Sequence, residues 1–226
     1  MAVPSVFFDT ETSGLFAADN IPDLHCVCVY DPATNEYHRF YEKEGGAMRS
    51  ETVAKACKHL LTCGKQVCGF NSTAYDLRLL AHHCNDTKLK GDLAELAFTH
   101  IDIILNFWSR TGYPTSLQSM ASGIKCGNKL MAGQDAVEAW RQGNLEQVLA
   151  YCDADCKLLA DVHDYATTYG RLTRLNKQNK LQSVALDGYT LEDTMSCLNA
   201  LAELDTSWMS TPIVPDYEWA VNALSP

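Results

Sequence analysis

The first part of the chain alternates between short apolar runs and polar breaks, a pattern typical of β-strands. Residues 3–8 are mainly apolar and end abruptly at Asp9, which predicts a buried strand with acidic residues at its end. Residues 25–30 and 36–41 are rich in β-forming residues, and the turn sequence Asp-Pro-Ala-Thr-Asn separates them. We therefore expect one strand followed by a β-hairpin.

Helical spacing begins near Ser50, which we expect to cap a helix with one apolar face. The pattern then predicts a strand over residues 66–70, a helix over 74–83, a strand over 101–105 and a short helix over 116–121. Three strands that can pair antiparallel, followed by alternating strands and helices, favour an α/β fold with a mixed β-sheet flanked by α-helices. This order resembles the ribonuclease-H-like fold.

A regular helical stripe in the third quarter of the chain contains an acidic residue. Val148, Leu158 and Val162 recur at helical spacing, and Tyr151 and Asp155 complete the same stripe. Burying an ionised carboxylate without a partner costs several kcal/mol or more. Asp155 is therefore expected to meet either a metal ion or a basic residue from elsewhere in the fold.

The pattern changes near residue 169. Beyond it, four cations recur every third residue, and residues 191–204 form a further amphipathic stretch. The cations are Arg171, Arg174, Lys177 and Lys180. Such a series is more often a solvated face than a track for phosphates, and both readings stay open. We divide the chain into a main domain, residues 1–168, and a helical C-terminal extension, residues 169–226, packed on it.

Composition limits the classes of function. The 226 residues are 46% hydrophobic, enough for one substantial core, and carry a formal net charge of -10. A protein that grips polyanions over its whole surface would need an excess of Lys and Arg. A small basic lip beside metal-binding carboxylates is still compatible with nucleic acid. No apolar run approaches the length of a membrane span, so no membrane partner is expected.

The ten cysteines are expected to be reduced. The chain starts without a charged segment followed by an apolar signal core, which favours the cytoplasm or another reducing compartment over secretion. Cys26 and Cys28 alternate in a predicted strand, and Cys152 and Cys156 are one helical turn apart, but the four-ligand spacing of a zinc finger is missing. We expect the cysteines to be small core residues.

The acids near the predicted strand ends suggest a cation site. Asp9 and Glu11 are two residues apart and would share one face of a strand at its carboxyl end. Asp76 would lie in the first turn of a helix, after a strand that breaks at Asn71. Each pattern also has an ordinary explanation, because acids are mostly exposed and complement the dipole at a helix start.

Three motifs, in the same order, resemble those of the DEDD exonuclease superfamily. The first is Phe-Phe-Asp-Thr-Glu over residues 7–11, the second runs from Asn71 to an aromatic-Asp pair at Asp76, and the third is Tyr-x-x-x-Asp over residues 151–155. Tyr at position 151 is similar to the DEDDy branch, which includes the proofreading domains of family A and B DNA polymerases. The likeness extends over about residues 3–165 and includes Ser-Leu-Gln-Ser-Met-Ala and Trp-Arg-Gln-Gly, which resemble stand-alone polymerase-B-related exonucleases.

The resemblance implies a 3′-to-5′ exonuclease that hydrolyses phosphodiester bonds at a single-stranded end. Two Mg²⁺ or Mn²⁺ ions would be held by Asp9, Glu11, Asp76 and Asp155. Tyr151 would orient the attacking water. Contacts to the terminal nucleotide would come from Thr10, Leu15, Phe70 and Asn71. Asp102 is expected to cap a helix or to support the metal ligands.

Three functions remain open at this point. DNA is the expected substrate, but the same scaffold would serve RNA, and the sequence identifies no reader of a 2′-hydroxyl. An alternative from another class is a non-catalytic nucleic-acid-binding module, because fold alone does not guarantee activity. All four acids are present, which favours catalysis.

Overall fold

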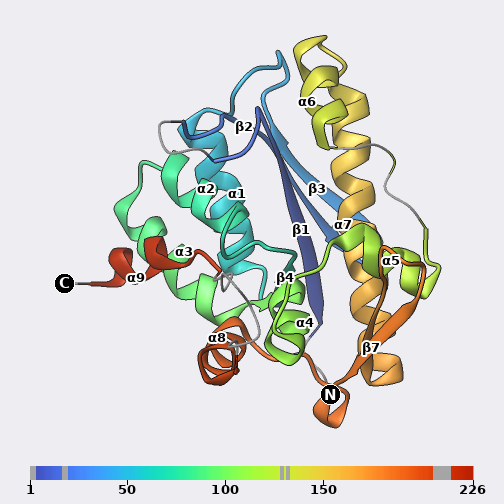
Figure 1. The fold of residues 1–226 in the computed structure, drawn as a ribbon. Helices are drawn as coiled ribbons and strands as arrows, with labels where there is room; N and C mark the ends of the chain where they lie inside the picture. Colours follow the sequence, from blue (N-terminus) through green and yellow to red (C-terminus); the bar gives the residue numbers. More distant parts are fainter. Residues whose placement is uncertain (1–3, 17–19, 128–129, 131–132, 206–214, 226) are drawn as a thin grey trace.

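The computed structural model describes residues 4–16, 20–127, 130, 133–205 and 215–225 (Figure 1). The strands are β1 (Ser5–Thr12), β2 (Leu24–Asp31), β3 (Glu36–Tyr41), β4 (Gln66–Gly69), β5 (Ile101–Asp102), β6 (Arg171–Leu175) and β7 (Leu181–Ala185). The helices are α1 (Ser50–Thr62), α2 (Asp76–His83), α3 (Thr87–Thr99), α4 (Ile103–Thr111), α5 (Leu117–Ile124), α6 (Gly133–Arg141), α7 (Leu145–Tyr169), the short 3-10 helix η1 (Asp187–Tyr189), α8 (Thr194–Glu203) and α9 (Glu218–Leu224).

The main sheet has five strands in the order β3-β2-β1-β4-β5. β1 pairs antiparallel with β2, and β2 pairs antiparallel with β3. β4 runs parallel to β1, and β5 runs parallel to β4. This mixed sheet with helices on both faces confirms the expected ribonuclease-H-like α/β fold, and it confirms the predicted hairpin.

The alternation of side chains along β1 separates two apolar clusters. Val6 and Phe8 pack in one cluster with residues of α1, α2 and α3. Phe7 points to the other face, into a cluster built with residues of α5 and α7. Figure 1 shows α1 and α2 on one side of the sheet and the long helix α7 on the other. The sheet is therefore the middle layer, and residues of β1 reach both helical layers.

The strand predicted over residues 101–105 is wrong beyond Asp102. After the two residues of β5, the chain turns into α4 at Ile103. Ile103 packs in the cluster with α7, while Ile104 and Trp108 pack in the opposite cluster. A helix that is buried on several sides looks like a continuous apolar run, and such a run does not distinguish a strand from a helix.

The expected capping role of Ser50 is also wrong. Arg49 occupies the N-cap position of α1 and makes no side-chain cap bond, and Ser50 is the first residue of the helix. The Glu42 carboxylate accepts hydrogen bonds from the Arg49 backbone N–H (3.1 Å) and from the Thr52 hydroxyl (2.7 Å). A carboxylate from the preceding segment therefore serves the helix start, and the Ser50 hydroxyl accepts the N–H of Asn85 instead.

The C-terminal extension is helical only in part. Residues 171–185 form the antiparallel hairpin β6–β7 instead of the helix that the period of the cations indicated. The turn explains the difference: the Asn176 side chain accepts the N–H groups of Gln178 (3.0 Å) and Lys180 (2.9 Å), and Asn179 adopts a left-handed φ of 56°. α8 and α9 follow and pack on α4 and α3, respectively.

Before the C-terminal extension, the described residues contain two further helices that the sequence pattern did not predict, α3 and α6. Asp86 caps α3 by accepting the N–H of Leu89 at 3.2 Å.

Among the helices of the described residues, none has both the length and the apolar composition that a bilayer crossing would need.

Candidate active site

β1 presents its two acids toward α7. Asp9 and Glu11 follow Phe7 at intervals of two residues, so they share the face of the sheet that α7 covers. The thiol of Cys152 on α7 lies 3.4 Å from the backbone oxygen of Asp9. Both acids stand at the carboxyl end of β1, beside the end of the parallel strand β4. Ligand sites of α/β folds form at such ends.

Thr10 points to the opposite layer and binds the third acid. Its hydroxyl donates a hydrogen bond to the carboxylate of Asp76, the first residue of α2. Asp76 is buried, and burial raises the pKa of its carboxyl to about 7. The hydrogen bond from Thr10 opposes this shift, whereas the charge of Asp102 adds to it. A cation beside Asp76 would favour the ionised form.

The loop between β4 and α2 is held by hydrogen bonds to the side chain of Asp102. The Asp102 carboxylate accepts the backbone N–H groups of Asn71 (2.8 Å) and Thr73 (3.1 Å) and the Thr73 hydroxyl (3.2 Å). Asn71 lies two residues beyond the end of β4 and has a left-handed φ of 60°, which Asn tolerates better than most residues. Asp102 occupies the N-cap position of α4 but makes no side-chain cap bond there. The expected helix cap is therefore wrong, and the Asp102 side chain instead supports the loop that leads to Asp76.

α7 supplies the remaining two predicted catalytic residues. Tyr151 and Asp155 are buried, as are Val148, Leu158 and Val162, so the predicted stripe is confirmed as the inward face of α7. A separation of four residues places the two polar side chains one above the other on that face. The tertiary fold brings this helix against β1, 140 residues earlier in the chain.

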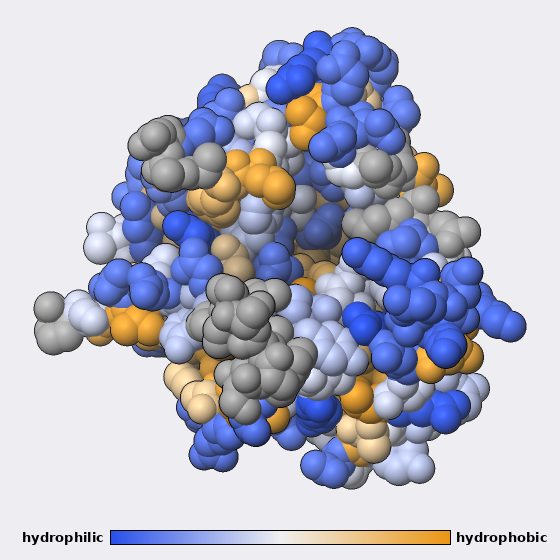
Figure 2. Space-filling model, viewed as in Figure 1, coloured by the Kyte–Doolittle hydropathy of each residue, from blue (hydrophilic) through white to orange (hydrophobic). Residues whose placement is uncertain are grey.

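One cleft contains every predicted site residue. It has a volume of about 230 Å³, and Figure 2 shows the viewed face hollowed near its centre. Its lining consists of Asp9, Thr10, Glu11, Leu15, Phe70, Asn71, Tyr75, Asp76, Tyr151 and Asp155. β1, the β4–α2 loop and α7 each contribute to this wall, so three sequence-distant segments meet there.

Tyr75 is the cleft residue that the sequence reasoning did not assign to the site. Its hydroxyl lies 2.7 Å from the Thr12 hydroxyl and also donates to the backbone oxygen of Gly14. These contacts tie the start of α2 to the segment that follows β1. The aromatic residue directly before Asp76 was the available signal, because it forms part of the second motif.

The donor atoms at this end of the sheet fit a hard divalent cation. Ligand atoms of Asp9 and Glu11, with the sulfur of Cys152, all lie within 4.8 Å of one another. Asp76 and Asp155 line the same cleft. Carboxylate oxygens suit Mg²⁺ and Mn²⁺, which prefer oxygen ligands. Four carboxylates in one cleft also need positive charge between them.

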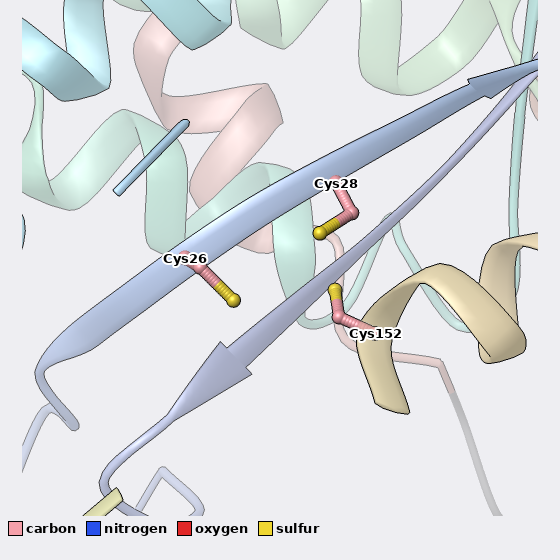
Figure 3. A group of neighbouring side chains, drawn as sticks. All are labelled: Cys26, Cys28 and Cys152. Carbon is pink, nitrogen blue, oxygen red and sulfur yellow. The ribbon is translucent and has the colours of Figure 1, made fainter. Parts of the chain in front are cut away.

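A cluster of thiols lies next to these acids. Cys26 and Cys28 on β2 and Cys152 on α7 direct their sulfur atoms toward one another (Figure 3), and the three sulfurs lie within 4.8 Å. All three side chains are buried. In the register of the sheet, Cys26 is the partner of Glu11 and Cys28 is the partner of Asp9. Here the cysteines have the core position expected of them, and they pack directly against the acidic site.

Comparison with known proteins gives a family and a fold. The family model described as the RNase_H superfamily matches residues 6–167. The family B DNA polymerase of the hyperthermophilic archaeon Pyrobaculum calidifontis is similar in structure, with a TM-score of 0.53 at 12% sequence identity. That match covers 73% of this chain and 24% of the polymerase, so this chain spans about a quarter of the polymerase's length. The likeness concerns the fold.

A second solved structure is described as 3′-end specific recognition of histone mRNA stem-loop by 3′-exonuclease. Its TM-score is 0.44 at 12% identity, and the match covers 86% of this chain and 96% of that one. No match is found among curated proteins.

Proposed function

This chain belongs to the RNase H superfamily, and from that premise we propose that it is a metal-dependent 3′-to-5′ exonuclease acting on single-stranded DNA. The superfamily is one of nucleases that use divalent metal ions. The observation that carries the proposal is the single cleft in which Asp9, Glu11, Asp76, Tyr151 and Asp155 converge. Several carboxylates in one cleft can hold the two ions that a two-metal hydrolysis of a phosphodiester uses.

The acids divide between two ions in this proposal. Asp9, Glu11 and Asp155 would hold one Mg²⁺ or Mn²⁺ ion, and Asp9 with Asp76 would hold the other. When bound, such ions supply a water of lowered pKa and stabilise the leaving 3′ oxygen. Thr10 keeps Asp76 oriented through its hydrogen bond, so that this carboxylate is in place before an ion arrives.

The other cleft residues orient the reactants. Tyr151 aims the attacking water with its hydroxyl and acts as an orienting hydrogen-bond partner rather than as the base. Leu15 is 77% exposed and, with Phe70, offers apolar surface to the terminal nucleotide. Asn71 places its side chain at the same wall. The catalytic domain would be residues 1–168, with residues 169–226 packed on it.

The experiment that tests the proposal compares cleavage of DNA and RNA strands of one sequence. Strands labelled at the 5′ end should shorten stepwise with Mg²⁺ or Mn²⁺, DNA faster than RNA, and a blocked 3′ end should prevent this. Asp9→Ala and Asp155→Ala should abolish cleavage while the fold remains intact, because removing one of several clustered acids relieves repulsion in the metal-free protein.

The matched control is Asp161→Ala, which removes an acid from α7 that pairs with Lys157 at 2.5 Å outside the cleft. This variant should cleave like the wild type. Wild-type activity in Asp155→Ala would contradict the assignment of the ions. Faster shortening of RNA would make the chain an exoribonuclease, and binding without any cleavage would favour the non-catalytic alternative.

A further inference from the structure

Neighbouring cavities lead from the catalytic cleft to the β6–β7 hairpin. A neighbouring cavity of about 550 Å³ shares Asp9, Phe70 and Asn71 with the cleft. It shares residues 114–116 with a further cavity of about 820 Å³. Because each cavity has lining residues in common with the next, the three cavities lie one after another between the acids and the hairpin, and we call this row of cavities the furrow.

We call the outer cavity the hairpin groove. One wall consists of residues 113–116, Gln118 and Ser119, and the other consists of residues 174–178 and Gln182. The second wall belongs to the β6–β7 hairpin, for which the spacing of the cations had indicated a helix. Close packing holds the two walls together: a Cβ added to Gly123 of α5 would stand 2.7 Å from the backbone of Arg174.

The hairpin groove is a basic region of an acidic protein. The chain has a formal net charge of -10, yet residues 165–186 contain four cations and no acid. Two of the cations, Arg174 and Lys177, line the groove. Figure 2 shows a group of strongly hydrophilic residues over α5 and the hairpin, beside the central hollow. Charge of this sign next to a phosphodiesterase cleft fits a polyanion.

Arg174 is held in a fixed position within the groove. Its guanidinium donates to the Gln182 side chain at 2.7 and 2.8 Å and lies 4.6 Å from the centre of the Tyr113 ring. A cation that is already ordered loses less conformational entropy when it binds a phosphate. Side-chain amides of Asn176 and Gln178 stand on the same wall and can bind phosphates or bases without selecting a sequence.

We propose that the hairpin groove binds the backbone of a single nucleic-acid strand upstream of the 3′-terminal nucleotide in the cleft, with phosphates at Arg174 and Lys177. This inference rests on the proposed function, since it needs a 3′ end at the acids. The groove contacts phosphates, which DNA and RNA share, so it should bind both kinds of strand with equal affinity. Discrimination between them would then arise in the cleft.

Another cavity adjoins the cleft on the side of α6, and it fits a nucleic-acid strand less well. That cavity of about 770 Å³ shares Thr10, Glu11, Leu15 and Tyr75 with the cleft, and its cation is Arg141. The lining of that cavity also includes the acid Glu11, and Arg141 lies 3.9 Å from Glu138, whereas the lining of the hairpin groove includes no acid among the described residues. Electrostatic attraction therefore favours the hairpin groove.

The first test measures binding of labelled DNA and RNA strands of about 16 nucleotides to the metal-free protein, where cleavage is suppressed. Lys177→Glu should weaken the binding of both strands by about tenfold, because it replaces a phosphate contact by repulsion. Lys177→Ala should lower the slope of log K against log salt by about 0.7. The matched control is Lys55→Glu, which makes the same charge change at an exposed lysine of α1.

The second test compares cleavage of the long strand with cleavage of a dinucleotide, which reaches only the cleft. Lys177→Glu should raise KM for the long strand and leave cleavage of the dinucleotide unchanged. The double variant Arg174→Ala/Lys177→Ala should show a larger effect in the same direction. Its folding is checked separately because Arg174 packs on aromatic rings, and Lys177→Glu alone already decides the question.

The outcomes separate the two proposals. If the wild type cleaves neither substrate but Lys177→Glu still weakens binding, the groove stands and the exonuclease activity is wrong. If the wild type cleaves and Lys177→Glu binds and cleaves the long strand normally, the groove is wrong. An equal loss in Lys55→Glu, or a larger loss in Arg141→Ala than in Lys177→Ala, would also overturn it.

Discussion

The hydroxyl of Thr10 donates a hydrogen bond to Asp76 from the face of β1 opposite to Asp9 and Glu11. Adjacent residues of a strand point to opposite faces. Thr10 therefore binds the acid on α2, while Asp9 and Glu11 point toward α7. The motif Asp-Thr-Glu therefore connects both helical layers at the cleft. In this arrangement Thr10 acts on the third acid, in addition to the nucleotide contact proposed for it.

At the same scale, Tyr151 offers a test of orientation against metal binding. If Tyr151 only aims the water, Tyr151→Phe should lower the rate of cleavage about ten- to a thousand-fold, the effect of one lost catalytic hydrogen bond, with metal affinity nearly unchanged. Asp155→Asn should be far more harmful, because a proposed metal ligand loses its charge. Single-turnover cleavage at saturating Mn²⁺ measures both variants, and equal losses would contradict the division of roles.

Among the elements, the β4–α2 loop depends on Asp102 below it. Asp102→Ala would leave the backbone N–H groups of Asn71 and Thr73 without their acceptor, so we expect the free energy of unfolding to fall by about 2 kcal/mol or more. The rate of cleavage should fall as well, because the loop positions Asp76. Asp102→Asn keeps an acceptor oxygen and should cost less.

Urea unfolding of these variants tests the prediction for the loop. Asp187→Ala, which removes an acid from the exposed helix η1, is the control and should behave like the wild type. A wild-type free energy of unfolding in Asp102→Ala would show that the loop is held by other contacts.

A second element, α6, is joined to the sheet by a ring pair that responds to pH. The His25 ring stacks on the Trp140 ring, with centroids 4.4 Å apart and planes 7° apart. Burial lowers the pKa of His25 to about 4; the charge of Asp23 opposes this shift, and that of Arg141 adds to it. The folded protein therefore prefers the neutral ring, and unfolding takes up a proton below the unfolded pKa of 6.5.

The stabilising contribution of neutral His25 should be complete above pH 6.5 and should be lost as the pH falls toward 4. His25→Phe keeps an aromatic ring for Trp140 but cannot be protonated. We expect the free energy of unfolding of the wild type to fall relative to that of His25→Phe across this range. Urea unfolding at a series of pH values measures the difference, and parallel profiles would contradict the prediction.

For the whole molecule, the extension is expected to be necessary for folding. Four leucines of the extension are buried: Leu172, Leu186 and Leu191 belong to the apolar cluster with α7, and Leu198 belongs to the opposite cluster. Each buried leucine contributes roughly 1.5 to 3 kcal/mol, against a total stability of about 5 to 15 kcal/mol. A chain ending at Gly170 should therefore lose cooperative thermal unfolding, because it would leave both clusters open.

The control for this truncation is a chain ending at Asp205, which keeps the hairpin and α8. It loses the contacts of α9 with α3, including buried Ala220, and should show a lower Tm but still unfold cooperatively. Calorimetry distinguishes the two truncations. A chain ending at Gly170 with the wild-type Tm would mean that residues 1–168 form an independent domain.

Sequence by itself determined the elements in which local pattern and burial agree. The strand before Asp9, the β2–β3 hairpin and the inward stripe of α7 follow from periodicity and turn residues, which are properties of neighbouring positions. The motifs named residues that line one cleft of the structure, because residue spacing on a strand or helix decides which side chains share a face. Their assignment as the catalytic site stays a prediction. Asp9 and Glu11 share a face of β1, and Tyr151 and Asp155 share a face of α7.

Only the tertiary structure decided features that depend on partners far along the chain. The apolar run after Ile101 forms α4, which packs against apolar clusters on two sides. Asp102 supports the β4–α2 loop, about 30 residues earlier in the chain. The cations after Gly170 became a hairpin that joins the furrow from the cleft, although their spacing indicated a helix. Burial and long-range hydrogen bonds set these outcomes, and neither is a property of a local segment.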